Sequence, residues 1–433
     1  MSKNKFWFFL LFALFFCLIL LYSWFSYGMT APNLVLLKAD WFWQFQSQMW
    51  RTFFNDRQLT AKIYFLIISL LFVVYFGLLK FVSRLKETLS HKTILSLLSV
   101  TLLPLLFSYN MLSYDVFNYI FNARMVVEYQ ANPHIKVALD FPDDPWTRFM
   151  HNTHTPAPYW YGWTAFSLVP YVVGMDKFAL TWLVFRSLSI LSVFLLYWIL
   201  NLLHKKIYSR PLDAFQIILV FFNPLFLIEI VSNSHNDLWM IVPAIASLYL
   251  LTTHKSENIS LIKIFCSVLL LLFSVSTKQA TLVLLPIWAL LFFKNNILML
   301  KIAQANWPVF VKKIIVIATH KISELINYWW PTFASLLLFI PLLTDRSQQF
   351  HPWYLTWSLV WLPLIRISTW KIILVGFSIS SLYRYLPWIL AGGYGEEVIH
   401  QQKMITWLPS LILLMATYLW QRRQNNTNLT RIE

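Results

Sequence analysis

The chain has 433 residues, of which 58% are apolar and only 12% are charged. Soluble domains carry roughly 25% charged residues, so this composition excludes an ordinary soluble protein and predicts one that is largely solvated by lipid. The formal net charge of +16 does not indicate a nucleic-acid partner, because the basic residues fall in short segments between apolar runs. Both cysteines, Cys17 and Cys266, lie inside apolar runs and have no metal-type spacing.

Apolar runs of nearly the 20 or so residues that a membrane span requires recur along the whole chain. The first run is longer than the apolar part of a signal peptide, and no A-x-A-like cleavage site follows it, so we expect an uncleaved first span. We predict a single all-α membrane domain over residues 1–433 with about twelve spans. Their expected positions are 5–27, 61–84, 93–112, 178–203, 213–231, 236–253, 259–275, 280–293, 326–343, 353–367, 371–389 and 404–420.

The run 158–176 is ambiguous, because it starts at Pro158, contains Pro170 and is rich in aromatic residues. If it re-enters or lies on the surface, all the basic segments fall on the same side as the N-terminus, which is then cytoplasmic. If it crosses as a thirteenth span, the segment 205–210 moves to the outer side. We expect the first arrangement, with both termini cytoplasmic.

The largest outer segment, 113–177, opens with polar and aromatic residues that could form a helix. Asp115, Asn118, Tyr119 and Asn122 would share one face of that helix, at spacings of three and four residues. A carboxylate where the chain leaves the bilayer can act as a general base on a sugar hydroxyl or bind a divalent cation. An interfacial amphipathic helix with Asp115 as its N-terminal charge explains the same residues without a function.

Further along this segment, Asn132-Pro133-His134 is followed by several aspartates and histidines. Their spacing fits no metal signature, and a solvated loop accounts for most of them. His154, which precedes Thr-Pro-Ala-Pro, is the strongest candidate in this group.

An intramembrane carboxylate is the next candidate. Glu229 lies inside the predicted span 213–231, and such carboxylates usually face a cavity or a partner. It is followed by Asn233-Ser-His235-Asn236-Asp237, in which Asn and Asp side chains could cap the next helix. Capping explains one or two of these residues, but it does not explain Glu229 and His235 as well.

Three basic side chains are candidates for holding a phosphate group. Lys278 lies at an outer helix junction, where a snorkelling membrane anchor is the alternative explanation. Arg186 and Arg384 lie inside predicted spans, and a structural pair with Glu229 is the rival interpretation.

The last candidate group is Asp345-Arg346 and His351-Pro-Trp-Tyr354. An aromatic belt at the membrane interface explains Trp353 and Tyr354 without a function. It does not require the histidine and proline that precede them.

In this order, the motifs resemble those of the membrane-embedded GT-C glycosyltransferases, most closely bacterial mannosyltransferases that use a polyprenyl-phosphate sugar. The run from Asn223-Pro-Leu through Glu229 to Asn233-Ser-His-Asn-Asp237 is similar to the family's N-P-L…E…N-x-H-N-D. His351-Pro-Trp-Tyr matches its H-P-W-Y, and the likeness covers roughly residues 93–420.

The family's outer-loop motif D-x-Y-x-Y…G-R…G-x-N-P-Y is matched less fully. Its counterpart here runs from Asp115 through Tyr119 and Arg124 to Asn132-Pro133-His134, with both glycines and the first tyrosine replaced. The family's Y-P-P turn is present only as Thr155-Pro-Ala-Pro. These departures affect the backbone path of the loop and the identity of the acceptor.

The resemblance implies a helical bundle with one large catalytic outer loop at about 113–177. It implies an enzyme that moves a hexose, mannose by analogy, from a polyprenyl phosphate to an extracytoplasmic glycan or lipid acceptor. Asp115 would be the catalytic carboxylate, and no metal site is implied, although the need for a divalent cation stays open. The residues expected to bind donor or acceptor are Tyr119, Arg124, Asn132, His154, Glu229, His235, Asn236, Asp237, Lys278, His351, Tyr354 and Arg384.

Two other functions remain as alternatives. A transporter or flippase of lipid-linked sugars would place charged residues near the bilayer midplane and often has inverted repeats, whereas here polar residues gather at the outer ends of spans and no repeat is visible. An oligosaccharide polymerase or ligase should have more paired outer arginines than Arg124, Arg148 and Arg346 provide. We therefore expect an enzyme of the bacterial inner membrane with an extracytoplasmic active site and no nucleic-acid partner.

Overall fold

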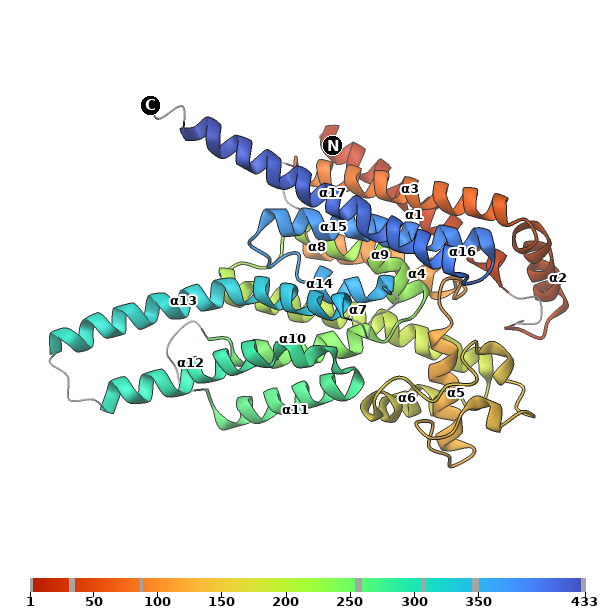
Figure 1. Cartoon of the computed structure of the whole chain (residues 1–433), viewed down its shortest axis with the longest axis horizontal. Helices are drawn as coiled ribbons and strands as arrows, with labels where there is room; N and C mark the ends of the chain where they lie inside the picture. The colour runs from red at the N-terminus through yellow and green to blue at the C-terminus, as the bar shows by residue number, and fades with distance from the viewer. Residues whose placement is uncertain are drawn as a thin grey trace.

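The computed structural model describes residues 3–30, 36–85, 89–253, 259–304, 309–344 and 350–429. The regular elements in these ranges are helices, with short 3₁₀ or π turns labelled η. Most helices run along the long axis of the molecule, and α2, α5 and α6 gather at the right-hand end of Figure 1. The predicted all-α architecture is therefore confirmed.

In the N-terminal part, the long helices α1 (Lys3–Phe25) and α3 (Arg57–Val82) lie side by side. Asp56 caps the second of them by accepting a hydrogen bond from the Leu59 amide, and Ser90 caps the next helix in the same way through Thr93. Aromatic and aliphatic side chains fill the contact between the long helices. The elements are α1 (Lys3–Phe25), η1 (Ser26–Met29), α2 (Asp40–Met49), η2 (Trp50–Phe54), α3 (Arg57–Val82) and α4 (His91–Leu106).

The predicted outer segment 113–177 folds as a compact cap with its own hydrophobic core. The Phe178 ring stacks on that of Phe149 with centroids 3.8 Å apart, and Phe117 stacks beside them at 6.0 Å from Phe178. These rings fasten the cap to the beginning of α7. The elements are α5 (Asp115–Val127), η3 (Ala138–Asp140), η4 (Thr147–Phe149), α6 (Tyr161–Val173) and α7 (Phe178–Tyr208).

The predicted span 213–231 is broken. Two helical segments meet at an angle of 50° at Asn223-Pro224, and the second continues as a π-helical turn. The elements in this region are α8 (Ala214–Phe221), α9 (Pro224–Phe226), η5 (Leu227–Ser232), α10 (Asp237–Leu251), α11 (Leu261–Thr277), η6 (Gln279–Leu284) and α12 (Leu285–Gln304).

The prediction of a helical span at 353–367 is wrong. This stretch is a 3₁₀ turn, one short helix and a series of turns, and nearly all its side chains are buried in protein. Irregular backbone is tolerated at membrane depth when protein surrounds it, because neighbouring groups can satisfy its N–H and C=O groups. The elements here are α13 (Val309–Phe339), η7 (Ile340–Leu343), η9 (Pro352–Leu355), α14 (Thr356–Leu359), α15 (Ser368–Tyr383), α16 (Tyr385–Ala391) and α17 (Glu396–Leu429).

The helices are those of an integral membrane protein, but twelve spans are not confirmed. Within the described residues, five helices are long and apolar enough to cross a bilayer, and a sixth span results if the bent pair at Asn223-Pro224 counts as one. Four further apolar helices are shorter. α6 has 13 residues and is about 20 Å long, which is too short to cross a hydrocarbon core of about 30 Å by itself.

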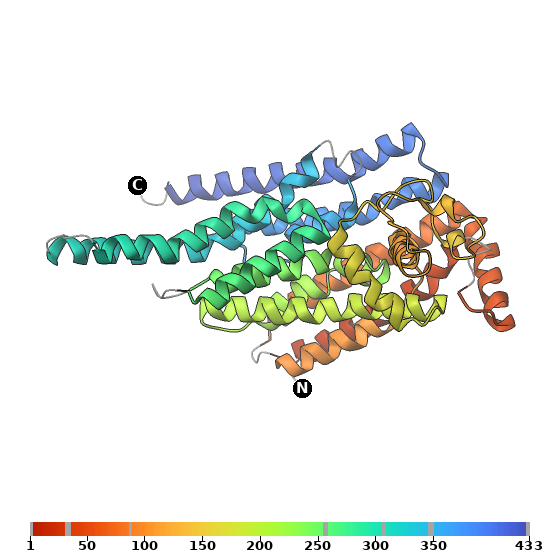
Figure 2. The same cartoon turned by 90° about the horizontal axis from the view of Figure 1, so that it is seen from below.

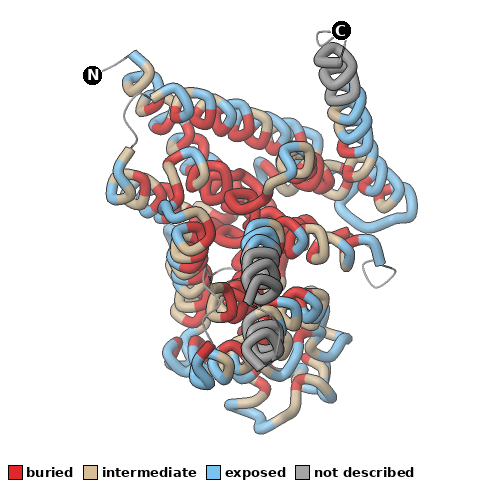
Figure 3. Tube along the Cα trace, turned by 90° about the vertical axis from the view of Figure 1, so that its left-hand side faces the viewer, coloured by how far each residue is buried: buried red, intermediate tan, exposed pale blue. Residues whose placement is uncertain are grey.

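The outer faces of the bundle carry many large apolar side chains. Phe65, Val73, Leu272 and Met415 are each more than half exposed. Figure 3 shows buried residues concentrated at the centre of the bundle and exposed ones on its outer surfaces. An exposed apolar surface of this extent is suited to contact with lipid acyl chains.

Two ends of the bundle can be distinguished by the contacts of α7. Its first residue, Phe178, packs in the cap, whereas the hydroxyl of its last residue, Tyr208, donates to the Leu364 carbonyl at 3.1 Å. Arg366 lies over the Tyr208 ring. The buried segment 353–367 therefore runs from the cap end, at η9, to the opposite end, and Figures 1 and 2 show the termini away from the cap.

Candidate functional site

The site begins at Asp115, the first residue of α5. The stretch is helical over Asp115–Val127, and the helix turns Asn118, Tyr119 and Asn122 into the protein. The Asp115 side chain keeps 18% of its surface exposed. It is thus a carboxylate with one side in the protein and one side open.

A local feature of the sequence brings Glu229 and His235 to the same place. The Asn223 side chain accepts a hydrogen bond from the Leu225 amide, and Pro224 occupies the first helical position, so a new helix starts at the bend. After η5, Ser234 adopts a positive φ of 56°, and the His235 amide then donates to the Glu229 carbonyl at 3.3 Å. The chain thereby folds back so that the His235 ring lies against the Glu229 side chain.

His235 lies between two carboxylates. Its Nδ1 is 3.4 Å from Oδ2 of Asp115, and its Nε2 is 3.3 Å from Oε2 of Glu229. Glu229 is completely buried. It accepts hydrogen bonds from the Tyr385 hydroxyl at 3.0 Å and from the side-chain amide of Asn233 at 3.0 Å. We call Asp115, His235 and Glu229 the triad.

The charges in the triad shift each other's protonation. Burial lowers the pKa of His235, but the two adjacent carboxylates outweigh burial and raise its pKa to about 9. Burial likewise raises the pKa of Asp115, but His235 and Lys278 outweigh it, so the net pKa lies below the ordinary value. The ionised carboxylate of Asp115 is therefore favoured at neutral pH.

A second ion pair lies beside the triad. Nζ of Lys278 is 2.8 Å from Oδ1 of Asp237, and the Trp357 indole donates to the same oxygen at 2.6 Å. Lys278 follows α11 directly, and its ammonium lies 5.7 Å from the centre of the Tyr159 ring. The structure thus places a lysine charge at the cap end, next to a residue whose side chain interacts with Asp115.

Capping of α10 does not account for the polar run before it. Asn236 stands at the N-cap position, but its side chain makes no capping hydrogen bond. Both polar atoms of its amide are buried and have no hydrogen-bond partner among the described residues, and the same holds for Oδ2 of Asp237. Buried polar atoms of this kind cost free energy unless a bound molecule or water satisfies them.

The Trp353 indole joins the last motif to the triad. Its ring stacks on His235 at 3.9 Å and on His351 at 4.5 Å, with interplanar angles of 20° and 16°. Burial lowers the pKa of His351 to about 4, so this imidazole is neutral. The Tyr354 ring lies 4.4 Å from Trp357, next to the Asp237 pair, whereas Asp345 and Arg346 lie outside the described residues.

Tyr119 completes the wall of the site. Its hydroxyl accepts a hydrogen bond from the backbone N–H of Asn236 at 3.4 Å, and its ring packs edge-on against Tyr159 and Trp163. These contacts therefore bring eight of the predicted residues together. Each of them contacts another of the eight directly or through one intervening side chain. They are Asp115, Tyr119, Glu229, His235, Asn236, Asp237, Lys278 and His351, with Tyr354 at the edge.

Arg124 is engaged elsewhere in the cap. Its guanidinium donates to Asp144 at 2.5 Å, to Tyr171 at 2.9 Å and to Asp176, and it lies over the Trp146 ring. These contacts tie the end of α5 to the loop before α6, to α6 itself and to the turn after it. In the structure Arg124 thus supports the cap, and its role in donor binding stays a prediction.

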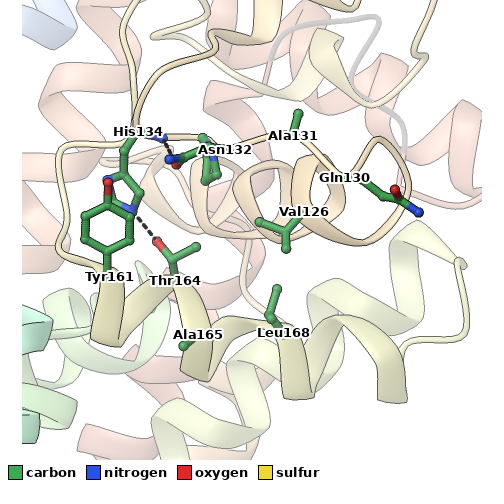
Figure 4. A pocket seen from close by; sticks show the side chains of 10 residues that line it. Val126, Gln130, Ala131, Asn132, His134, Tyr161, Thr164, Ala165 and Leu168 are labelled. Atoms are coloured by element: carbon green, nitrogen blue, oxygen red, sulfur yellow. Dashed lines mark hydrogen bonds between the residues drawn. The ribbon is translucent and has the colours of Figure 1, made fainter.

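Asn132 lies on a surface hollow between α5 and α6, of about 570 Å³. Its Oδ1 accepts a hydrogen bond from the His134 amide, and the His134 ring bonds to the Thr164 hydroxyl at 3.0 Å, as Figure 4 shows. No residue of the triad lines the hollow, so this hollow and the polar cluster are different places. The lining residues are Val126, Gln130, Ala131, Asn132, Pro133, His134, Tyr161, Thr164, Ala165 and Leu168.

Two other predicted residues lie apart from the triad. His154 is exposed on the loop before α6. Arg384, between α15 and α16, is buried, donates to the Thr406 hydroxyl at 3.2 Å and lies near the Phe350 ring. It adjoins Tyr385, which holds Glu229, so Arg384 is one residue removed from a contact of the triad.

Arg186 does not pair with Glu229. Its buried guanidinium donates to the carbonyls of Leu105, Leu106 and Ser232 and to the side chains of Asn110 and Ser108. The carbonyl end of α4 carries partial negative charge, which accommodates a cation without a carboxylate. The pairing with Glu229 that the sequence offered is therefore wrong, whereas a role of Arg186 as a phosphate ligand stays a prediction.

Sequence reasoning missed four aromatic residues of the site: Tyr159, Trp353, Trp357 and Tyr385. Trp353 stands inside the H-P-W-Y motif, but membrane-belt chemistry explained it equally well. The others carry no local signal, because only the packing of separate helices brings them to the triad. Within the part of the chain that the structure describes, no group of three His, Cys, Asp or Glu side chains is placed to hold a metal ion.

Comparison with known families matches residues 14–294 to the MptA_B family, described as alpha-(1->6)-mannopyranosyltransferase, N-terminal domain. The chain belongs to the MptA_B family. It is therefore a glycosyltransferase with a mannosyltransferase domain, consistent with the GT-C resemblance, and an enzyme rather than a transporter. Neither the comparison with curated proteins nor that with solved structures gives a match.

The match to the MptA_B family covers the triad and the Asp237–Lys278 pair. It ends before His351, Trp353 and Tyr354, which ring contacts bring to the site. The fold thus connects a part of the chain that the family describes with a later part that it does not.

Proposed function

We propose that this protein transfers a mannosyl residue from a polyprenyl phosphate to a hydroxyl group of a glycan or lipid acceptor on the extracytoplasmic side of the bacterial inner membrane. The observation that carries the proposal is the triad at the cap end of a membrane-embedded bundle. Its outermost member, Asp115, is partly exposed, whereas the side chains of Glu229 and Asp237 are completely buried. Asp115 is thus the carboxylate that an acceptor can reach.

In the proposed reaction, Asp115 accepts the proton of the acceptor hydroxyl as its oxygen attacks the anomeric carbon. The bond between that carbon and the phosphate oxygen breaks, the polyprenyl phosphate leaves with both electrons of that bond, and the anomeric centre is inverted. The donor is already activated by its phosphate ester, so the protein contributes mainly by positioning and by charge. The ammonium of Lys278 supplies positive charge for the leaving phosphate.

The side chains with unsatisfied polar atoms favour a sugar at this place. Asn236 and Asp237 offer donor and acceptor atoms that are buried and unpaired among the described residues, and a sugar hydroxyl can satisfy both kinds.

The test is mannosyl transfer from a synthetic polyprenyl-phosphate-mannose by the purified protein in nanodiscs. Asp115→Asn is expected to lower kcat by about 10²–10⁴-fold, the usual contribution of general base catalysis. Asp143→Asn, which changes an exposed aspartate of the same segment, is the matched control and should leave transfer unchanged. Normal transfer by Asp115→Asn would refute the catalytic assignment, and no transfer from any polyprenyl-phosphate sugar would refute the donor.

A further inference from the structure

The two nitrogens of the His235 ring face different carboxylates. Asp115 lies 3.4 Å from Nδ1 and Glu229 lies 3.3 Å from Nε2. A neutral imidazole carries one proton, so it would turn a lone pair toward one of the two carboxylate oxygens. Only the doubly protonated ring can present an N–H group to both.

The surroundings of the His235 ring favour its positive charge. The ring is completely buried and stacks on the electron-rich face of Trp353 at 3.9 Å, a contact that stabilises a cation. On the other face of Trp353 lies His351, which burial keeps neutral, so no second positive charge competes there. Burial of the cation is compensated by two carboxylates rather than one.

Glu229 differs from Asp115 in its accessibility. It receives hydrogen bonds from Tyr385 and Asn233, and its side chain is completely buried. No substrate can reach it without displacing these partners. Its position behind His235 therefore suits a supporting role rather than contact with the reacting atoms.

We propose that His235 is a doubly protonated imidazolium that holds the Asp115 carboxylate in its reactive orientation, and that Glu229 keeps His235 in that state. His235 and Glu229 are then positioning residues, and Asp115 is the member of the triad that touches the substrate. The proposal deepens the proposed function and rests on it for the role of Asp115. It concerns a proton that stays on the imidazole, so no further reactant is needed.

Other titratable groups also face this pair and enter its electrostatics. Lys278 and Tyr159 both act on Asp115 and lower its pKa. Tyr385 bonds to Glu229, and His351 lies behind Trp353. These groups are unchanged in the variants below, so a shift caused by removing one carboxylate can be attributed to the triad.

The first measurement is the pH dependence of kcat. With a His235 pKa of about 9, the proton is retained below that pH, so wild-type kcat should fall as the pH rises through about 9. Glu229→Gln removes one carboxylate and thereby lowers the pKa of His235. The pH at which kcat falls should then be lower than in the wild type by about 1–3 pH units. The KM for the donor should stay within about twofold, because a positioning defect acts on the reacting complex.

Two variants make the result specific. Glu229→Asp keeps a negative charge, so its kcat should fall at nearly the same high pH as in the wild type. Glu396→Gln, at an exposed carboxylate, should leave the pH dependence of kcat unchanged. Folding of each variant is checked by its thermal unfolding in detergent. A folded Glu229→Gln protein with the wild-type pH dependence of kcat would overturn the proposal.

The second measurement does not need transfer activity. In wild-type protein with ¹⁵N-labelled histidine, one of the ten histidines should give the NMR signature of a doubly protonated ring at pH 7.5. That signal should disappear in His235→Gln. A neutral His235 in the wild type would overturn this inference even if Asp115 proves catalytic, whereas a charged His235 in a protein that transfers no mannose would overturn the proposed function alone.

Discussion

At the residue scale, the site combines side chains that carry charge with side chains that hold those charges in place. Lys278 is the clearest example, because its ammonium is bound to Asp237 and flanked by aromatic rings instead of reaching into water. A membrane anchor would extend toward the headgroups. The geometry of Lys278 therefore fits a phosphate ligand that Asp237 and Trp357 keep in position.

We predict that Lys278→Met lowers kcat/KM for the polyprenyl-phosphate donor by about 100-fold, because a buried charge on the leaving phosphate would lose its counter-charge. The measurement is steady-state transfer at several donor concentrations. Lys136→Met, which changes an exposed lysine paired with Asp140 at 3.9 Å, is the control and should be neutral. Unchanged kinetics in Lys278→Met would remove the lysine from the donor site.

At the element scale, close packing of α6 against the end of α11 sets the position of Lys278. The Trp160 amide donates to the Thr277 carbonyl at 3.4 Å. A Cβ atom added at Gly162 would lie 2.0 Å from Oγ of Ser276 and 2.7 Å from its carbonyl oxygen. Only glycine permits this approach, because any other residue would push α6 away from the turn that carries the lysine.

Gly162→Ala is therefore expected to reduce transfer by roughly 10–100-fold, since a displacement of about 1 Å at a catalytic group can cost that much. Transfer is measured alongside thermal unfolding, to separate a shifted site from a lost fold. Gly393→Ala is the matched control, because nothing lies within 4 Å of a Cβ atom there. If Gly162→Ala retains full activity, the α6–α11 contact does not position the site.

At the scale of the whole molecule, the two ends of the bundle differ in chemistry. The cap end holds the triad, whereas the opposite end holds Arg366 over the Tyr208 ring and Lys206 bonded to the Tyr249 carbonyl. The excess of lysine and arginine at one end favours a cytoplasmic location for that end. The cap would then face the outside of the cell.

This orientation can be tested by cysteine labelling in a variant whose native residues Cys17 and Cys266 are replaced by serine. A membrane-impermeant maleimide added to intact cells should label Asn152→Cys in the cap and should label Ser209→Cys after α7 only once the membrane is opened. Both positions are exposed. Labelling of Ser209→Cys from outside would reverse the proposed orientation.

Several features could be predicted from the sequence because they depend on local chemistry. Apolar mass requires lipid, and the spacing of Asp115, Asn118, Tyr119 and Asn122 suits one face of the helix that forms there. The break at Asn223-Pro224 was not predicted, because the residues on both sides of it are apolar and read as one span. The polar residues after Glu229 could be recognised as unusual, since intramembrane charge is costly. None of these inferences required knowledge of which helices are neighbours.

Other features depended on which helices pack against each other. Residues 353–367 have the composition of a span, yet protein surrounds them, and so their backbone does not need to form one continuous helix. Arg186 and Glu229 have opposite charges and lie in adjacent parts of the bundle, but the carbonyl end of α4 takes up the arginine and His235 takes up the glutamate. Composition cannot distinguish such partners, because each charge is satisfied by whichever group the packing places within reach.

The sequence by itself determined that this chain belongs in a membrane and that its reactive polar residues lie in a few short runs, because hydrophobicity and charge act residue by residue. Only the tertiary structure decided that Asp115, His235 and Glu229 form one triad, with Trp353 stacked on it from a motif more than a hundred residues later. The physical reason is that protonation and orientation depend on distances of 3–4 Å between groups far apart in the chain. Those distances are set by helix packing.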